Sequence, residues 1–316
     1  MGERTQRMVV ALGDRALASP SSPASEQALA AELVHHLHSV LAAGVELVVT
    51  HSGSQLGDTG LAVQAHTLEK AAGATSMGQG DPLARSLRTE LNEARPVTSL
   101  MAYVSVDPAS LVFRRPRRPA GPVVDEAKAE ELRQRGQTVT VEERGQGYRR
   151  LVPQVEPIEV LDVLVLRRAL ESGAVVVAGS GGGIPVVREG EGWCRADAVL
   201  DQDLTAAVLA DSLDADQLFI VTDVTNVFEA FGTPHEEPIG LISVDEMRNL
   251  LAEGHFLPGT MAPKVEACVR FVSRPGRRAV ICDAASLERA MMGLAGTRVI
   301  WTPTAPSVSE FEHHVA

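Results

Sequence analysis

Four glycines stand within five residues, Gly179 to Gly183, directly after the apolar and β-branched run at 174–178. The run predicts a short buried strand, and glycines at its end let the backbone come close to a ligand. A strand that ends in such a turn presents N–H groups to an anion, as α/β sheets commonly do for a phosphate or a carboxylate. A tight turn without a ligand is the plain alternative for this segment taken alone.

A second candidate is the stretch from Leu200 to Ala207, where Asp201 and Asp203 come at the start of an apolar helix. An acidic helix cap explains these carboxylates when they are taken alone. Lys264 falls in the first turn of another predicted helix, where the helix dipole disfavours positive charge. Such a lysine is either exposed or held by a bound anion, for which a phosphate is suitable. Together the glycine turn, the carboxylates and the lysine predict an anion-binding site.

The elements that would position these groups alternate between strand and helix. Ser22 and Pro23 give helix-start chemistry to the segment after the first strand, and Gly44 ends that helix. Strand, helix and strand, each strand followed by a loop of small residues, predict a βαβ unit with its site at the carboxyl edge of the sheet. No Walker A or G-x-G-x-x-G pattern follows the first strand, which argues against ordinary P-loop and dinucleotide-binding folds. Apolar runs predict strands at 8–12, 46–50, 97–106, 174–178, 217–221, 278–282 and 298–301, and a hairpin at 224–234.

The segment at 107–153 differs in composition and predicts a small lid or arm that leaves the main sheet. It holds an arginine-rich run at 114–118 and a charged helix around 125–135. Solvent exposure is the usual state of such a charge run. Arginines above glycine-lined loops would also suit a clamp for phosphate oxygens. Both interpretations stay open from the residues alone.

Composition and charge limit the classes of partner. The chain has 316 residues and a net charge of −12, which argues against an extended nucleic-acid surface. No apolar run approaches the length of a membrane span, and residues 1–8 lack the apolar core of a signal peptide. Three scattered cysteines lack metal-ligand spacing and predict reduced thiols, two of them buried, in a cytoplasmic protein. We therefore expect no nucleic acid and no membrane as partners.

Four motifs of the second half are G-S-G-G-G-I-P-V-V at 179–187, A-V-L-D-Q-D-L-T-A-A-V-L-A at 198–210, T-D-V-T-N-V-F at 222–228 and P-G-T-M-A-P-K-V-E-A at 258–267. Together with G-Q-G-Y-R-R-L-V-P at 145–153, they closely resemble carbamate kinases, which belong to the amino-acid kinase fold family. The resemblance implies an open three-layer α/β/α sandwich with a mainly parallel central sheet, a small protruding lid subdomain at about 107–153, and a homodimer. It also implies an N-terminal acid-substrate half at 1–195 and a C-terminal nucleotide-binding half at 196–316.

The resemblance further implies an activity, in which carbamoyl phosphate and ADP are interconverted with ATP and carbamate, a small anionic acid, using Mg²⁺. Carried onto this sequence, Lys264 would contact the phosphates that are exchanged, and Asp203 would orient charged groups around the metal nucleotide. Arg118 stands where the family has a catalytic lysine in the arm. No side chain is assigned as a direct metal ligand. The acid would be bound by Gly13, Asp14, Arg15, His51, Gly53, Gly181, Gly182 and Gly183, and the nucleotide by Gln202, Thr222, Asp223, Phe228, Gly232, Met261 and Lys264.

The acid-binding half departs from the family pattern. Asp14 and Arg15 replace a glycine and an asparagine, the next loop is one residue shorter, and Gln202 replaces a lysine. The position of His51 at a strand end favours, by itself, a structural histidine over a ligand. Two hypotheses follow: an active kinase on carbamate or another small acid, or a catalytically impaired nucleotide-binding homologue with a regulatory or assembly role. A pocket closed by Asp14 and Arg15 would favour the second, and an open pocket with Arg15 and Arg118 pointing inward would favour the first.

Overall fold

A large sheet with helices on both faces organises the molecule. The structure, a computed structural model, describes residues 5–13, 16, 23–51, 82–92, 94–142, 145 and 147–303. The main-sheet strands in these ranges are β1 (Arg7–Leu12), β2 (Glu46–His51), β3 (Val97–Leu100), β10 (Val175–Ala178), β14 (Gln217–Thr222), β17 (Leu241–Ser243), β18 (Arg278–Asp283) and β19 (Thr297–Ile300). Their order is β17-β19-β18-β14-β1-β2-β10-β3, and among these neighbours β18 and β19 alone run antiparallel.

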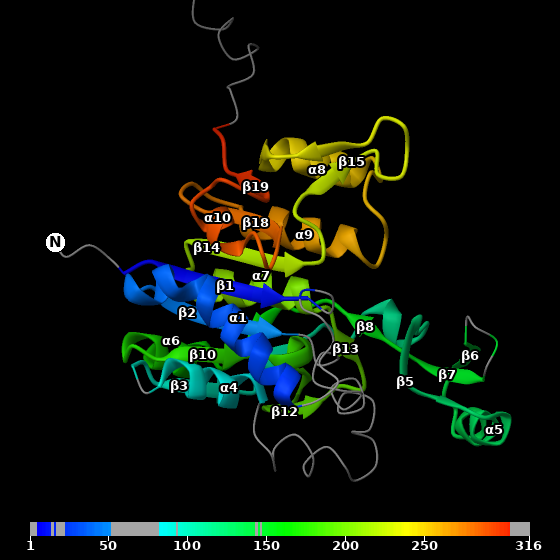
Figure 1. The fold of residues 1–316 in the computed structure, drawn as a ribbon. Helices are drawn as coiled ribbons and strands as arrows, with labels where there is room; N and C mark the ends of the chain where they lie inside the picture. The colour runs from blue at the N-terminus through cyan, green and yellow to red at the C-terminus, as the bar shows by residue number, and fades with distance from the viewer. Residues whose placement is uncertain are drawn as a thin grey trace, which may run out of the picture.

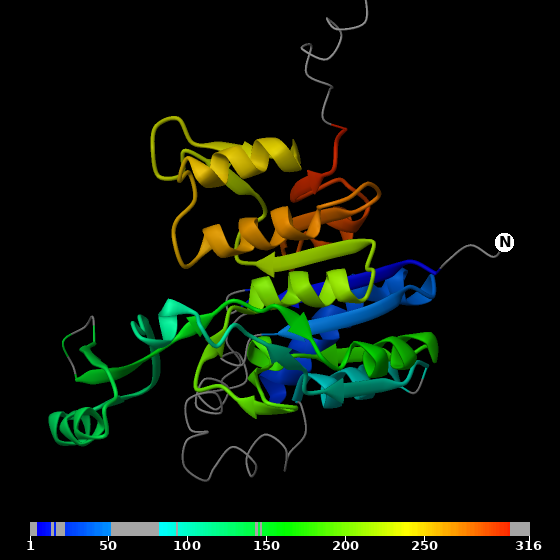
Figure 2. The same ribbon diagram turned by 180° about the vertical axis from the view of Figure 1, so that it is seen from behind.

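Two helical layers cover this sheet (Figures 1 and 2). One layer holds α1 (Pro23–Ala42), α4 (Pro82–Leu91) and α10 (Leu287–Met291), and the other holds α6 (Val163–Glu171), α7 (Gln202–Ser212), α8 (Val244–Ala252) and α9 (Met261–Phe271). Val10 and Leu12 of β1 pack in the core of the first layer, whereas Val9 and Ala11 pack in the core of the second. Successive strand side chains point to opposite faces, which explains this division. The predicted α/β/α sandwich is confirmed, and no helix in the described ranges is long and apolar enough to span a bilayer.

The parallel strands end at one edge of the sheet, and their register brings the last residues together. Leu12 of β1 pairs with His51 of β2 and with Val221 of β14. Thr222, the next residue of β14, pairs with Asp283 of β18. The carboxyl edge of parallel strands is where α/β sheets bind ligands. The loops that follow β1, β2, β10 and β14 begin at this edge, as the sequence predicts.

Two predicted boundaries are wrong. The strand expected at 97–106 is divided, because β3 ends in the main sheet while β4 (Tyr103–Ser105) joins a second sheet with β9 (Glu159–Val160), β11 (Ile184–Glu189) and β12 (Gly192–Arg195). The amide of Ile184 donates to the carbonyl of Ala102 at 2.8 Å, which draws the chain toward β11. The hairpin expected at 224–234 extends further, with β15 (Val227–Glu229) paired to β16 (Glu237–Ile239).

An arm projects from the sandwich, as Figures 1 and 2 show. It holds β5 (Arg118–Val124), α5 (Glu126–Gln134), β6 (Val139–Val141) and β7 (Tyr148–Val152). The chain returns through β8 (Gln154–Val155), which pairs with β13 (Val199–Leu200) just before α7. Arg150 of β7 also forms an ion pair with Asp197 at 2.8 Å. The protruding subdomain that the sequence predicts is therefore present, with its root next to the start of α7.

The three cysteines should differ sharply in reactivity. Cys268 and Cys282 are buried and Cys194 is exposed, as the sequence predicts for two of the three. Burial raises the pKa of the Cys268 thiol and raises the pKa of Cys282 to about 12, and a hydrogen bond with Glu189 raises the pKa of Cys194. Because the thiolate is the reactive form, we expect Ellman's reagent to label Cys194 alone in the folded protein, faster as the pH rises, and all three thiols after unfolding. Cys194→Ser should abolish labelling of the folded chain, and rapid labelling of a second thiol would contradict this expectation.

Candidate active site

Lys264 and Asp203 form a nearly buried ion pair near the carboxyl edge of the main sheet. The Nζ of Lys264 donates to Oδ2 of Asp203 at 2.8 Å, and the two side chains are 14% and 11% exposed. Asp203 lies in the first turn of α7 and Lys264 in the first turn of α9. The sequence offered two states for Lys264, exposure or a bound anion. The structure adds a further partner, because a carboxylate of the neighbouring helix holds the ammonium. A bound anion beside this pair stays a prediction.

Gly13 lies directly beside this pair. Its N–H donates to the carbonyl of Val221 at 2.9 Å, which fixes the chain where it leaves β1. A Cβ at Gly13 would stand 3.0 Å from the Val221 oxygen and 3.2 Å from Nζ of Lys264. Contacts so short would force a neighbour to move. The absence of a side chain at Gly13 therefore lets the Lys264 ammonium approach the end of β1.

Gln202 connects the start of α7 to the same strand end. Its Nε2 donates to the carbonyl of Leu12 at 2.7 Å. The amide is neutral, whereas the resemblance has a lysine at this position. Of Gln202, Gly13 and Lys264, only Lys264 brings positive charge to the end of β1.

Asp201 fixes the first turn of α7 and links it to the root of the arm. One carboxylate oxygen accepts from the amides of Asp203 at 3.0 Å and Leu204 at 3.1 Å, which is the acidic cap that the sequence predicts. The other oxygen accepts from Nε2 of Gln154 at 3.1 Å. The sequence analysis missed Gln154, although it directly follows the motif at 145–153. The pairing of β8 with β13 brings it to α7.

The glycine turn after β10 has left-handed backbone at all of its glycines. The φ angles are +64° at Gly179, +68° at Gly181, +91° at Gly182 and +89° at Gly183. A Cβ on Gly183 would lie 2.7 Å from the carbonyl oxygen of Ala102, and one on Gly182 would lie 3.1 Å from Cβ of Leu200. Packing against protein atoms thus explains Gly182 and Gly183 without a ligand. Anion binding by Gly181, Gly182 and Gly183 stays a prediction.

The residues expected to bind the acid are only partly described. Asp14, Arg15 and Gly53 lie outside the described residues, so the structure does not decide between a closed and an open pocket. His51 is 3% exposed at the end of β2, which fits the structural interpretation of this histidine. Arg118 begins β5 and lines a pocket at the root of the arm. Within the described ranges it makes no hydrogen bond or ion pair with Lys264.

The residues expected around the nucleotide come from three segments between β14 and α9: Thr222 with Asp223, Phe228 with Gly232, and Met261. Thr222 is buried at the end of β14, and its Oγ1 donates to Oδ1 of Asp223 at 3.2 Å. The ring of Phe228 lies 6.3 Å from that of Phe231, measured between centroids. Met261 begins α9, one turn before Lys264. Their contact with a nucleotide remains a prediction.

Comparisons with known proteins identify the family. The sequence pattern of the Amino acid kinase family matches residues 6–283. The chain belongs to this family. Carbamate kinase of Pyrococcus horikoshii is 33% identical over 310 residues, which cover 93% of this chain and 99% of that protein. Carbamate kinase 1 of Enterococcus faecium is 35% identical over 312 residues, with coverage of 94% and 98%.

A comparison with solved structures agrees with this assignment to the amino acid kinase family. Carbamate kinase from Giardia lamblia bound to AMP-PNP superposes with a TM-score of 0.83 at 25% identity, covering 94% of this chain and 99% of that chain. This amino acid kinase is therefore a carbamate kinase-like kinase, as its motifs predict.

Proposed function

We propose that this chain transfers a phosphoryl group between ATP and an oxygen of carbamate or of a related small acid, so that carbamoyl phosphate and ADP give ATP and carbamate. The observation that carries the proposal is the Lys264–Asp203 pair, held beside Gly13 at the end of β1. Phosphoryl transfer depends mainly on positioning and on charge stabilisation, and a fixed ammonium supplies that charge. The AMP-PNP bound to the Giardia lamblia relative supports ATP or ADP as the nucleotide.

Each residue of the pair would have a distinct role. Lys264 would contact the phosphate oxygens that are exchanged, and Asp203 would hold its ammonium in place. Because both side chains are nearly buried, solvent and salt would screen the attraction between ammonium and phosphate less than at the surface. The acid would lie in the half formed by residues 1–195 and the nucleotide in the half formed by 196–316. We also propose a cytoplasmic homodimer.

Mg²⁺ fits this site only together with the nucleotide. The ion takes oxygen ligands, usually one or two carboxylates with substrate phosphates. Within the described part of the chain, no three His, Cys, Asp or Glu side chains are placed to hold a metal. Asp203 offers a carboxylate beside the proposed phosphate position, so the nucleotide would supply most of the ligands. The bound ion would neutralise phosphate charge.

A second candidate is a nucleotide-binding homologue of low activity with a regulatory or assembly role. Gln202 favours it, because a neutral side chain bound to the carbonyl of Leu12 stands where the resemblance has a lysine. One charge pair at ~4 Å and an effective dielectric constant of ~20 is worth about 4 kcal/mol. The loss of such a charge near the phosphates would slow the transfer.

The test is ATP formation from carbamoyl phosphate and ADP, followed with a coupled assay. We expect the wild-type rate to fall below the roughly 1–100 s⁻¹ usual for kinases. Gln202→Lys should raise the rate by about 10-fold or more, because it adds a charge within reach of the phosphates. Gln202→Met is the matched control, since it has similar length but no charge, and it should bring no gain.

Two outcomes would change these conclusions. A wild-type rate within the usual kinase range would contradict the expected effect of Gln202. No ATP formation by wild type or Gln202→Lys, while ADP still raises the melting temperature by mass action, would favour the regulatory candidate over the kinase.

A further inference from the structure

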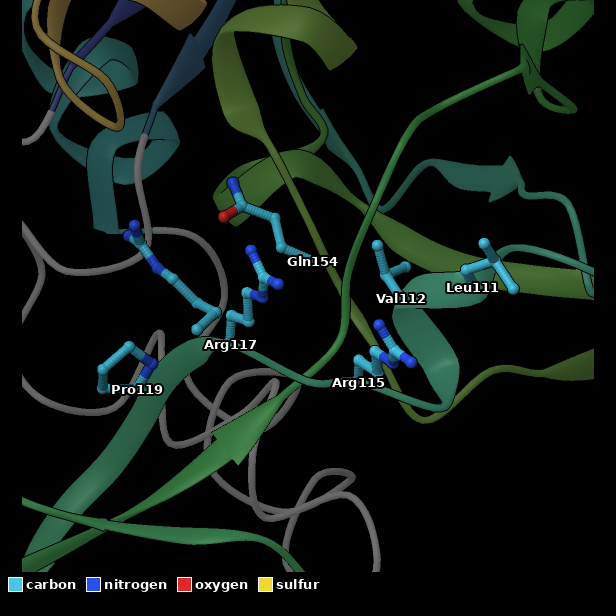
Figure 3. Close-up of a pocket in the computed structure, with 7 residues that line it drawn as sticks. Leu111, Val112, Arg115, Arg117, Pro119 and Gln154 are labelled. Atoms are coloured by element: carbon cyan, nitrogen blue, oxygen red, sulfur yellow. The ribbon is translucent and has the colours of Figure 1, made fainter.

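Three arginines line one pocket at the root of the arm. The pocket has a volume of about 490 Å³ and is lined by Leu111, Val112, Arg115, Arg117, Arg118, Pro119 and Gln154. We call it the arginine pocket. Figure 3 shows Arg117 pointing toward Gln154, whereas Arg115 lies beside Val112. Apolar side chains and guanidinium groups thus line one open pocket, in which Arg115 and Arg117 are exposed and Arg118 is half-buried.

The arginines of this pocket differ from their neighbours on the arm in how they are paired. Arg149 and Arg150 of β7 form ion pairs with Glu142 and Asp197. In contrast, the side chains of Arg115, Arg117 and Arg118 in the pocket form no hydrogen bond or ion pair with another described residue. The chain as a whole has a net charge of −12, so acidic partners are abundant elsewhere. Three like charges, with no carboxylate among the described residues that line the pocket, favour an anion between them.

The arginine pocket is connected to the proposed active site through Gln154. Nε2 of Gln154 donates to Asp201 at 3.1 Å, and Asp201 caps the first turn of α7. The next residue but one, Asp203, holds the ammonium of Lys264. An acid that reached from the pocket toward the start of α7 would therefore approach the residues proposed for phosphoryl transfer.

The pocket is large for carbamate. A cavity volume of about 10–15 Å³ is enough for one water molecule, so an ion of four non-hydrogen atoms needs about 40–60 Å³. The arginine pocket, which is partly open to solvent, has 490 Å³. A guanidinium is a planar fork that matches a carboxylate or a phosphate with two hydrogen bonds. Size and charge together fit a small carbon chain that bears an anionic group.

We propose that the acid substrate carries a second anionic group, which Arg115 and Arg117 bind while its first carboxylate receives the phosphoryl group. This inference rests on the proposed function and names the substrate class, a short-chain dianion. In the reaction, a carboxylate oxygen forms a bond to the γ-phosphorus, and the bond from that phosphorus to the bridging oxygen breaks. ADP leaves with the electron pair of that bond. The second anionic group takes no part in the chemistry and fixes the orientation of the acid.

The first experiment measures binding to the full-length chain by calorimetry, with AMP-PNP present. Succinate and butyrate are the matched probes, because they have the same number of carbons and differ in the second carboxylate. We expect succinate to bind about 10-fold more tightly than butyrate, the gain of one charge-assisted hydrogen bond. 3-Phosphonopropionate, in which a phosphonate replaces one carboxylate, shows which anion the pocket prefers. Preference for either dianion over butyrate supports the proposal, and equal binding of all three probes overturns it.

Substitutions then assign the preference to the pocket. Arg115→Gln/Arg117→Gln should abolish the preference for the dianion. Arg168→Gln/Arg289→Gln, which changes the net charge equally at two exposed arginines of α6 and α10, should retain it. AMP-PNP should stabilise all of these proteins against heat, which verifies that they are folded. A preference that survives in the pocket variant overturns the proposal.

A second measurement separates this inference from the proposed function. Acyl phosphate formed from ATP and each acid is trapped with hydroxylamine, and ATP formation from carbamoyl phosphate and ADP is followed in parallel. Faster trapping of acyl phosphate with succinate than with butyrate supports both the kinase activity and the preference for a dianion. ATP formation without any preference among the acids overturns the inference and leaves the kinase. A dianion preference in binding that the pocket variant loses, with no turnover in either direction, overturns the kinase and leaves an anion-binding pocket.

Discussion

Lys264→Ala should lower kcat for phosphoryl transfer by about 10²–10³-fold, the usual cost of losing one well-placed stabilising group. The KM for ATP should rise by less, because the ammonium matters most when charge builds up in the transition state. Lys264→Arg should recover little activity, since a planar fork does not replace a compact ammonium. The space is also restricted, because even a Cβ on Gly13 would lie 3.2 Å from Nζ. Steady-state kinetics with carbamoyl phosphate and ADP measure both constants. Unchanged turnover and unchanged nucleotide affinity in Lys264→Ala would place the phosphate site elsewhere.

The loss of the cation should also destabilise the fold. The Asp203 side chain is only 11% exposed, and removing one partner of a buried ion pair costs about 3–5 kcal/mol. Lys264→Met should therefore lower the free energy of unfolding by about this amount, measured with urea. Asp203→Leu/Lys264→Met should regain most of the loss, because it removes both charges, while staying inactive. If the double variant were no more stable than Lys264→Met, the unpaired Asp203 carboxylate would not be the cause of the lost stability.

Gly183→Ala should destabilise the protein by about 2–5 kcal/mol, through backbone strain together with overpacking. The φ angle of Gly183 is +89°, and a Cβ there would stand 2.7 Å from the carbonyl oxygen of Ala102 and 3.0 Å from a methyl group of Val104. Neither the backbone carbonyl nor the buried strand β4 can move away easily. Urea unfolding measures the loss.

Gly254→Ala is the matched control for this prediction. Its φ angle is +81°, close to that of Gly183, but no atom lies within 4 Å of the added Cβ. We expect only the cost of the left-handed backbone, about 1–2 kcal/mol. The difference between the two variants measures the close approach to Ala102. Equal losses of unfolding free energy in the two variants would show that backbone conformation alone requires a glycine at position 183.

Local signals in the sequence were sufficient for most elements of the sandwich. The apolar run at 174–178 predicts the strand that the structure places between β2 and β3. Asp201 caps α7, and Ser243 with Glu246 forms a capping box on α8. Such signals act within a few residues of the chain. They could be recognised without knowing which elements pack together.

Contacts between distant segments could not be predicted in the same way. Lys264 and its partner Asp203 are 61 positions apart, and Gln154 and Asp201 are 47 apart. Each contact depends on how two elements pack, which neither segment encodes alone. The division of the expected strand at 97–106 has the same origin, because β11 pairs with its second part.

The sequence by itself determined the alternation of strand and helix, the carboxyl-edge loops and the family motifs, because each depends on residue type and short spacing. Only the tertiary structure decided that a carboxylate holds the Lys264 ammonium, because α7 and α9 must pack together to bring the two charges within 2.8 Å. It likewise decided that Gly182 and Gly183 are required by packing, because Leu200 and Ala102 come close only in the folded chain. The tertiary structure also decided the arginine pocket, because its lining residues at 111–119 come together with Gln154 of β8 only in the folded chain.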